Sequence, residues 1–312
     1  MAPLHVIVIG SGVAGLSCAR LLQEAGHRVE ICARERPPRT TSNVAAAFWY
    51  PYRVSPADRV HAWARASFAA FERLLPIAEA GILRREALEL LAGPVEPSWA
   101  ALLPKSRPAR SDELPAGHRF GQIFESLVVE TPRYIPWLCD AFLAAGGTLV
   151  ERALGGIDEA LAAADAVFLC AGLGARELAP DPSVSPVRGQ ILRVRNPGLD
   201  RVIVDEHGEG AITYVVPRAQ DVILGGTSDE GDERLAADPA ATAAILERCV
   251  ALEPRLRDAP LLEVLVGLRP CRPTVRVERE ERGGTPLIHN YGHGGAGITL
   301  SWGCAAEAVG LL

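Results

Sequence analysis

Two glycine-rich segments, one near each end of the chain, are the places where residue types suggest chemistry. In "VIVIGSGVAGLS", Gly10, Gly12 and Gly15 have the spacing G-x-G-x-x-G between a β-branched apolar run and a helical pattern. The first glycine allows a tight turn, the second lets a pyrophosphate approach the backbone, and the third lets helix and strand pack closely. The unpaired N–H groups at the helix start would face the phosphates. The spacing therefore predicts dinucleotide binding, which NAD and FAD both fit.

The second glycine-rich segment lies almost at the other end of the sequence. Residues 290–303 read "NYGHGGAGITLSWG" and contain five glycines. Glycine costs about 0.5 to 1 kcal/mol relative to alanine in a regular element, so this density favours a backbone that a ligand approaches closely. A helix is expected to begin near Ile298, and its first N–H groups could stabilise negative charge on that ligand. His293 suits either a general base or a residue that orients the backbone.

Two further residues have the chemistry to bind a carboxylate. Arg269 lies in "GLRPCRPTVRVERE" and Tyr214 in "TYVVPR". A guanidinium group matches a carboxylate with two parallel hydrogen bonds, and the tyrosine hydroxyl adds a third. From the residues alone, Arg269 could instead pair with a neighbouring glutamate, and Tyr214 could be a strand residue in the core.

A third segment, residues 39–53, combines three kinds of residue. It reads "RTTSNVAAAFWYPYR", with hydroxyl residues first, then small ones, then bulky ones. Taken alone, it fits the N-capped start of a helix followed by aromatic core residues as well as it fits a ligand-binding loop.

The elements around these residues predict how they are positioned. The run "LHVIVIG", residues 14–26 and the run "HRVEICAR" read as strand, helix and strand, which make a βαβ unit. An insertion follows, with a helical stretch and a Pro-rich, charged excursion at residues 93–118. Further strands, with a helix that has Thr131 as its N-cap and Pro132 in its first turn, return to the sheet. Residues 201–226 alternate like an antiparallel meander.

One more helix and one more strand complete this order. The helix opens at Asp238, and the strand "PLLEVLVGLRP" precedes the second glycine segment. We therefore expect an α/β fold in which a Rossmann-type domain is interleaved with an α+β substrate domain built on an antiparallel sheet. The nucleotide-binding domain is predicted to comprise residues 1–50, 131–181 and 266–312, and the substrate-binding domain residues 51–130 and 182–265.

Taken together, these segments make the sequence resemble the D-amino-acid oxidase family of FAD-dependent enzymes. The motifs are "GSGVAGLS", the segment at 39–53, "TYVVPR", "GLRPCRPTVRVERE" and "HNYGHGGAGITLSWGCAAEA". The resemblance runs from about residue 4 to residue 310 and implies FAD as the cofactor, bound by a Rossmann domain like that of glutathione-reductase-like flavoproteins. In this family a small residue, here Ala33, stands where other flavoproteins have the ribose-binding acid.

The resemblance implies roles at individual positions. Arg269 and Tyr214 would hold the substrate carboxylate and Gly295 would offer its carbonyl to the amine, while Phe48 and Tyr50 would shape the side-chain pocket. The residues implied in FAD binding are Gly10, Gly12, Val13, Ala14 and Gly15 at the first turn; Ala33, Arg34 and Glu35 at the adenosine ribose; Thr40, Thr41 and Ser42 at the diphosphate; Ala45, Ala46 and Ala47 along the flavin; Leu154 at the adenine; Ala171 and Gly172 after a buried strand; and Arg269, Gly294, Gly295, Gly297, Ile298 and Thr299 around the flavin. Ala296 has no assigned role.

The reaction implied is the FAD-dependent oxidative deamination of D-amino acids. A hydride would pass from Cα to flavin N5, and the products would be the 2-oxo acid, ammonia and hydrogen peroxide. This transfer needs no protein base, which favours the backbone-orienting interpretation of His293 and leaves the rate to alignment and electrostatics. The alternatives are a glycine or sarcosine oxidase, a D-aspartate oxidase, or a D-amino-acid dehydrogenase of the same superfamily. The Arg269 and Tyr214 pair disfavours an FAD-binding module without turnover, and the second glycine segment has no role in an NAD-dependent dehydrogenase.

The large, mostly apolar side chains of Phe48 and Tyr50 favour neutral and apolar substrates. Basic substrates would be favoured if nearby acidic residues line the entrance instead of lying in a solvated loop, and acidic substrates if a second arginine reaches the pocket. The residues on which these alternatives depend are Asp205, Glu206 and Glu209 for basic side chains, and Arg53 and Arg218 for acidic ones. Relatives with an active-site lid carry a second tyrosine where this chain has Gly210, so we expect the lid to be absent or different.

Composition excludes several other classes of partner. The 312 residues carry a net charge of -6 with acidic and basic residues mixed along the chain, which gives no basic stripe for nucleic acid or an anionic membrane. The seven cysteines are scattered without metal-ligand spacing, so no metal is expected. We expect them to be reduced thiols in a cytoplasmic protein. The expected partners are the D-amino acid and O2, with a homodimer left open.

Overall fold

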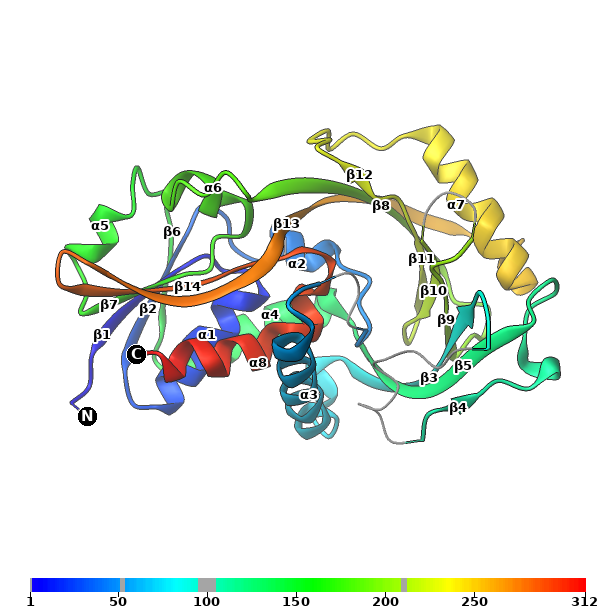
Figure 1. Cartoon of the computed structure of the whole chain (residues 1–312), viewed down its shortest axis with the longest axis horizontal. Helices are drawn as coiled ribbons and strands as arrows, with labels where there is room; N and C mark the ends of the chain where they lie inside the picture. Colours follow the sequence, from blue (N-terminus) through cyan, green and yellow to red (C-terminus); the bar gives the residue numbers. More distant parts are fainter. Residues whose placement is uncertain (1, 51–53, 95–104, 209–211) are drawn as a thin grey trace.

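The computed structural model describes residues 2–50, 54–94, 105–208 and 212–312 (Figure 1). A parallel sheet forms the first part of the fold, with the strand order β14-β7-β1-β2-β6. Its strands are β1 (His5–Ile9), β2 (Arg28–Ala33), β6 (Thr148–Glu151), β7 (Ala166–Leu169) and β14 (Thr285–His293). The apolar run predicted to be a strand buried on both faces is β1, at the centre of this sheet.

Helices cover both faces of the parallel sheet. On one face lie α1 (Val13–Glu24), α4 (Thr131–Ala144) and α8 (Gly297–Gly310), whose buried residues join β1 and β2 in the largest core cluster. On the other face, a smaller cluster contains residues of α5 (Asp158–Leu161) and α6 (Ala175–Leu178). This arrangement is the doubly wound fold, in which ligands bind beyond the carboxyl ends of the strands.

The second part is a mostly antiparallel sheet with the order β4-β5-β3-β9-β10-β11-β8-β13. The predicted meander is β9 (Arg201–Asp205), β10 (Thr213–Pro217) and β11 (Asp221–Gly225). Beside it lie β3 (Ile82–Leu91), β4 (Arg107–Pro108), β5 (Phe120–Val129), β8 (Ser185–Arg195) and β12 (Asp229–Glu230), the last paired with β8. Only β3 and β9 run parallel among the pairs in this part.

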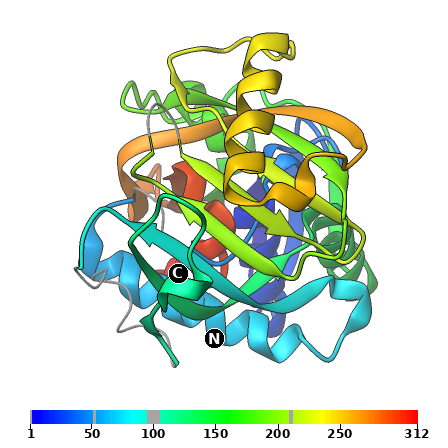
Figure 2. The ribbon, with the colours of Figure 1, turned by 90° about the vertical axis from the view of Figure 1, so that its right-hand side faces the viewer.

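Helix α7 (Pro239–Leu252) covers one face of the antiparallel part (Figure 2). Residues Ile245 and Cys249 of α7 pack with Leu88, Ile203 and Val215 of the strands. The opposite face, which carries Tyr214 and Val204, packs into the large cluster with the helices of the parallel part. The face with Tyr214 is therefore the one that looks toward the predicted cofactor site.

The two parts share strand β13 (Leu261–Arg282), which is 22 residues long. Its first half pairs with β8 and its second half with β14, and Cys271 pairs on both sides, with Ser185 and His293. The result is one continuous 14-stranded sheet, in which the boundary predicted at residue 266 lies inside a strand.

Helix α3 (Ala57–Leu74) and the short α2 (Thr41–Val44) join the two parts. Helices α3 and α8 approach so closely that a Cβ on Gly303 would lie 2.2 Å from the carbonyl oxygen of Trp63. The indole Nε1 of Trp63 also donates to Glu307 Oε2 at 2.6 Å.

Several local expectations differ from the structure. Helix α4 begins at Thr131 with Glu130 as its N-cap, so Thr131 is not the cap that its sequence position predicts. Strand β3 was not expected, because its sequence mixes charged and apolar residues without a clear period.

The predicted helix start at Asp238 is confirmed, since its Oδ1 accepts a hydrogen bond from Ala240 N at 2.8 Å.

Candidate active site

The first glycine turn is built around two positions where a side chain cannot fit. Gly10 has φ +111°, and a Cβ there would lie 2.5 Å from the carbonyl oxygen of Cys170. A Cβ on Gly15 would lie 1.9 Å from the carbonyl oxygen of Gly10. Gly12 is the N-cap of α1 and has no side chain to cap the first N–H groups of the helix.

A hydroxyl from the segment at 39–53 reaches this helix start. Ser42 Oγ accepts a hydrogen bond from Val13 N at 3.0 Å and would lie 3.1 Å from a Cβ on Gly12. Thr40 Oγ1 donates to Asn43 Oδ1 at 2.7 Å, and Thr41 is the first residue of α2. The structure thus brings one of the three predicted diphosphate-binding hydroxyls, that of Ser42, to the glycine turn.

The residues predicted to bind the adenosine gather at the carboxyl end of β2. Ser11 Oγ donates to the carbonyl oxygen of Glu35 at 2.5 Å, which holds the chain after Ala33 against the glycine turn. Arg34 and Glu35 are exposed, and Leu154 is half-buried against the cluster that contains Cys32. Ala171 and Gly172 follow β7, which lies on the other side of β1 from β2, and Gly172 has φ +56°.

Residues 45–47, predicted to lie along the flavin, are held by two buried side chains. Thr131 Oγ1 donates to the carbonyl of Ala45 at 2.8 Å. Arg218 Nε donates to the carbonyl of Ala46 at 2.9 Å, and its Nη2 donates to the carbonyl of Ala45 at 3.0 Å. Arg218 is 3% exposed, and burial lowers the pKa of its guanidinium to about 10. Arg218 is therefore engaged with the backbone and is not a second arginine for an acidic substrate.

The second glycine segment begins in the last residues of β14, makes a single 3-10 turn at Gly294–Ala296, and becomes α8 at Gly297. Gly294 has φ +53°, and Gly295 lies within the turn. The helix start predicted near Ile298 is confirmed. Ala296 is fully buried in the large core cluster, which assigns it to packing.

His293 is a buried residue of the second glycine segment. Its Nε2 lies 3.0 Å from Asn290 Oδ1, and the side chain is 5% exposed. Burial lowers the pKa of His293 to about 4, so the imidazole is neutral at neutral pH. These contacts support the interpretation that His293 orients the backbone.

The structure brings Arg269 and Tyr214 together on the site-facing side of the sheet. Arg269 Nη1 donates to the carbonyl of Thr227 at 3.0 Å, and the guanidinium lies so close over Gly189 that a Cβ there would approach it to 2.5 Å. Tyr214 is 8% exposed, and its ring packs on Gly225. Burial raises the pKa of Tyr214, against the opposing charge and hydrogen bond of Arg269.

The alternative role of Arg269, an ion pair with a nearby glutamate, is not what the structure shows. Within the described part of the chain, no carboxylate lies within ion-pair distance of its guanidinium. The neighbouring glutamates pair elsewhere, Glu278 with Arg276 and Glu280 with Arg282. The charge of Arg269 is left for a ligand.

Phe48 and Tyr50 stack on each other, with ring centroids 5.4 Å apart and an interplanar angle of 19°. Thr299, in the first turn of α8, donates to the carbonyl of Tyr50 at 3.0 Å and accepts from its N–H at 3.2 Å. The predicted side-chain pocket is therefore tied to the predicted flavin site. The hydroxyl of Tyr50 donates to Glu89 Oε1 at 2.8 Å, a partner that the sequence did not reveal.

The remaining candidate residues fall in two groups. Asp205 Oδ1 accepts from the N–H groups of His207 and Gly208 and so stabilises a turn. Glu206 approaches Tyr50 and contributes to raising its pKa. Arg53, Glu209 and Gly210 lie outside the described residues. The expectation that the lid is absent or different therefore stays a prediction.

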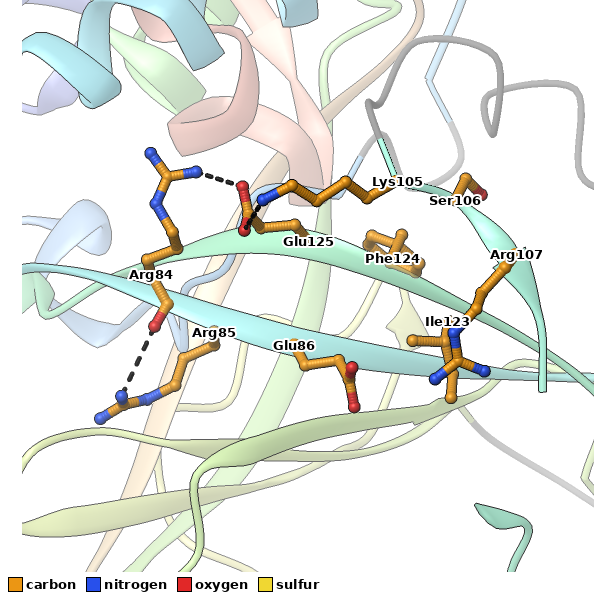
Figure 3. A pocket seen from close by; sticks show the side chains of 9 residues that line it. All are labelled: Arg84, Arg85, Glu86, Lys105, Ser106, Arg107, Ile123, Phe124 and Glu125. Atoms are coloured by element: carbon orange, nitrogen blue, oxygen red, sulfur yellow. Dashed lines mark hydrogen bonds and ion pairs between the residues drawn. The ribbon is translucent and has the colours of Figure 1, made fainter. Parts of the chain in front are cut away.

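A hollow of about 550 Å³ lies elsewhere, on the outer strands β3, β4 and β5 (Figure 3). None of the predicted site residues lines it. Most of its charged side chains are already ion-paired. Glu125 pairs with both Arg84 and Lys105, and Glu86 and Arg107 pair with Arg201 and Glu113. The hollow therefore has no connection to the predicted chemistry. The residues that line it are Arg84, Arg85, Glu86, Lys105, Ser106, Arg107, Ile123, Phe124 and Glu125.

The doubly wound sheet, the glycine turn and the small residues at 45–47 define a dinucleotide-binding α/β protein with an arginine and a tyrosine facing the site. Residues 5–311 match the model of the DAO family, the FAD-dependent oxidoreductases. The chain belongs to this family, and FAD is its cofactor. The residues present fit FAD, because side chains are excluded at Gly10 and Gly15 and are only methyl groups at 45–47.

Curated relatives match nearly the whole chain. A D-amino-acid oxidase from Rubrobacter xylanophilus is 52% identical over 310 residues, covering 98% of this chain and 95% of the relative. A D-aspartate oxidase from Homo sapiens is 37% identical over 331 residues, covering 100% of this chain and 95% of the relative. Among solved structures, a glycine oxidase from Bacillus cereus has a TM-score of 0.80 at 19% identity, covering 99% of this chain and 94% of that one. This last likeness shows the shared fold.

Proposed function

We propose that the protein oxidises D-amino acids to 2-oxo acids and ammonia. The observation that carries the proposal is the Arg269 and Tyr214 pair, which lies on the face of the antiparallel part that looks toward residues 45–47. The name of the 52% identical relative, D-amino-acid oxidase, supports the same reaction. When bound, FAD supplies the acceptor for the hydride that leaves Cα and passes the electrons to O2, which gives hydrogen peroxide.

The roles proposed for this chain's own residues follow from their placement. Arg269 binds the substrate carboxylate through its free N–H groups, and Tyr214 adds a hydroxyl hydrogen bond. The carbonyl of Gly295 accepts from the amine. The first N–H groups of α8 would stabilise the negative charge of a reduced flavin by about 0.3 to 2 kcal/mol. No residue has to remove a proton from Cα, which agrees with His293, because its buried imidazole is a weak base and contacts Asn290.

A D-aspartate oxidase is the second candidate, because a relative of that name is 37% identical. It would need a cation at the end of the side-chain pocket. Arg218 does not provide it, since its donors are directed at the carbonyls of Ala45 and Ala46. The apolar ring of Phe48, stacked on Tyr50, favours neutral and apolar side chains instead.

The domain organisation and the cellular location are also proposed. The parallel and antiparallel parts of the sheet support a division into two interleaved domains, although the predicted boundary at residue 266 lies within β13. A cytoplasmic location is supported by seven free cysteines, six of them buried. Within the residues that the structure describes, no helix is long and apolar enough to span a bilayer.

The experiment that tests the function is an oxidase assay on the purified protein. Its visible spectrum reports FAD, and peroxide is measured with D-amino acids, their L-enantiomers, glycine and sarcosine. We expect a yellow protein that acts on D-enantiomers. A colourless protein that cannot take up FAD, or activity confined to L-enantiomers, would contradict the proposal.

Arg269→Ala tests the carboxylate-binding role. Loss of two charge-assisted hydrogen bonds, each about 1.5 to 3 kcal/mol, should lower kcat/KM by at least about 100-fold. FAD absorbance should remain. Arg279→Ala is the matched control, because Arg279 lies on the same strand and pairs with Glu281 at the surface. Equal kinetics in both variants would remove Arg269 from the site.

A further inference from the structure

A buried carboxylate lies on the site-facing side of the sheet, two strands from Tyr214. Glu89 on β3 pairs with Val204 on β9, and Val204 pairs with Tyr214 on β10. Residues paired across neighbouring strands point to the same face of a sheet. Glu89 and Tyr214 therefore face the same side, the one opposite α7.

Half of this carboxylate is without a partner. Glu89 is 5% exposed, and its Oε1 accepts the hydroxyl of Tyr50 at 2.8 Å. Its Oε2 is buried and has no hydrogen-bond partner in the part of the chain that the structure describes. No lysine or arginine among those residues forms an ion pair with Glu89, as the described pairs of β3 involve Arg84 and Glu86. A buried carboxylate oxygen in this state needs a donor, which a ligand can provide.

Tyr50 connects this carboxylate to the substrate pocket. Its ring stacks on Phe48, its backbone is bonded to Thr299 at the start of α8, and its hydroxyl ends on Glu89. A substrate side chain that extends along the two rings would meet apolar surface first and the carboxylate afterwards. This order, apolar stem and then charge, matches the side chains of lysine, ornithine and arginine.

We propose that Glu89 is a specificity-determining residue that binds the ammonium or guanidinium end of long, basic D-amino acid side chains. The inference rests on the proposed oxidation of D-amino acids and names a substrate class for the same site. It extends the expectation of apolar substrates, because Phe48 and Tyr50 still contact the methylene groups. The carboxylate of the substrate remains with Arg269.

The charges around Glu89 predict how this preference depends on pH. The groups that face it are Tyr50, Glu206 after β9, and the neutral Gln122 on β5, which is occupied with Ser106. Burial raises the pKa of Glu89 to about 7, the hydrogen bond from Tyr50 opposes this, and the charge of Glu206 adds to it. Glu89 is therefore increasingly ionised as the pH rises through 7, and its attraction for a cation increases in the same direction.

Two pairs of substrates isolate the charge. D-arginine and D-citrulline have nearly the same shape but differ in charge. D-lysine and D-norleucine share the same apolar chain, and only D-lysine ends in an ammonium group. The quantity measured is the ratio of kcat/KM for the cationic to the neutral member. In the wild type we expect a ratio above one that rises between pH 6 and pH 8. Titration of the α-amine affects both members of a pair, so its effect on the ratio largely cancels.

Glu89→Gln keeps an acceptor for Tyr50 and removes the charge. The ratio should fall about tenfold or more, as for the loss of a charge-assisted hydrogen bond. Glu86→Gln is the matched control, because Glu86 lies on the same strand but pairs with Arg201 at the surface, and its ratio should equal that of the wild type. An unchanged ratio in Glu89→Gln, or an equal fall in the control, overturns the proposal.

The outcomes separate this inference from the proposed function. If D-citrulline or D-norleucine yields peroxide but the ratio of kcat/KM is the same in the wild type and in Glu89→Gln, the proposed function stands and the inference is rejected. An FAD-loaded protein inactive on every D-amino acid rejects both. If Glu89→Gln fails to fold, the wild-type pH series still decides, since a ratio that is flat or falls from pH 6 to pH 8 rejects the role of Glu89.

Discussion

Replacing Arg218 by methionine should weaken FAD binding far more than it weakens the fold. Arg218 donates to the carbonyls of Ala45 and Ala46, which we propose lie along the flavin. In the variant, Ala45 keeps its hydrogen bond from Thr131 Oγ1. The carbonyl of Ala46 loses its donor.

Two effects on folding oppose each other. An unpaired buried carbonyl at Ala46 costs about 1 to 3 kcal/mol. Burial lowers the pKa of Arg218 to about 10, so keeping this side chain charged in the interior is itself unfavourable, and methionine avoids that cost. The free energy of unfolding should therefore change little.

FAD affinity has no such compensation. A residue of the 45–47 segment that is no longer fixed must be ordered when FAD binds, at a cost of about 1 to 2 kcal/mol. This corresponds to an affinity about 5- to 30-fold weaker. Arg218→Lys keeps the charge but cannot reach both carbonyls at once with a planar fork, so its loss should be intermediate.

Titration of the apoprotein with FAD, followed by flavin fluorescence, measures the affinity, and the melting temperature of the apoprotein reports the fold. Arg193→Met is the control, because Arg193 shares Asp221 with Arg218 yet donates to none of residues 45–47. An Arg218→Met protein that binds FAD within twofold of the wild type would refute the reasoning.

Two further substitutions test the fold around the site. Gly15→Ala should yield little FAD-loaded protein, because its Cβ would lie 1.9 Å from the carbonyl oxygen of Gly10. Visible absorbance measures the FAD content, and a yellow Gly15→Ala protein with the melting temperature of the wild type would contradict the prediction. Gly156→Ala, which meets nothing within 4 Å, is its control. Asp238→Ala should lower the free energy of unfolding by about 1 kcal/mol through loss of the α7 N-cap, with kcat/KM unchanged. Urea denaturation measures the loss, and equal midpoints for variant and wild type would show that the cap contributes nothing.

The parts of the fold that could be predicted are those fixed by local rules. The turn at Gly10 and Gly15 has few sequence solutions, and the strand and helix that flank it follow their own periodicities. Thr131 shows where a local rule loses to tertiary structure. Its hydroxyl, expected to cap α4, instead donates to the carbonyls of Asn43 and Ala45.

Strand β3 and Glu89 show why other features could not be predicted. The sequence "ILRREALELL" has no clean alternation, and it is a strand because β5 and β9 bind it from both sides. A glutamate in such a run is usually solvated. Only the contact with Tyr50, 39 residues earlier in the sequence, shows that Glu89 is inside.

The shared strand β13 has a consequence for how the enzyme can move. Many two-lobed enzymes admit substrate by swinging one lobe away from the other on flexible connections. Here the connection includes Cys271, which lies on a strand and is paired on both sides, with Ser185 and His293. A swing would have to break main-chain hydrogen bonds at that point, which favours substrate exchange through movements of loops and side chains instead.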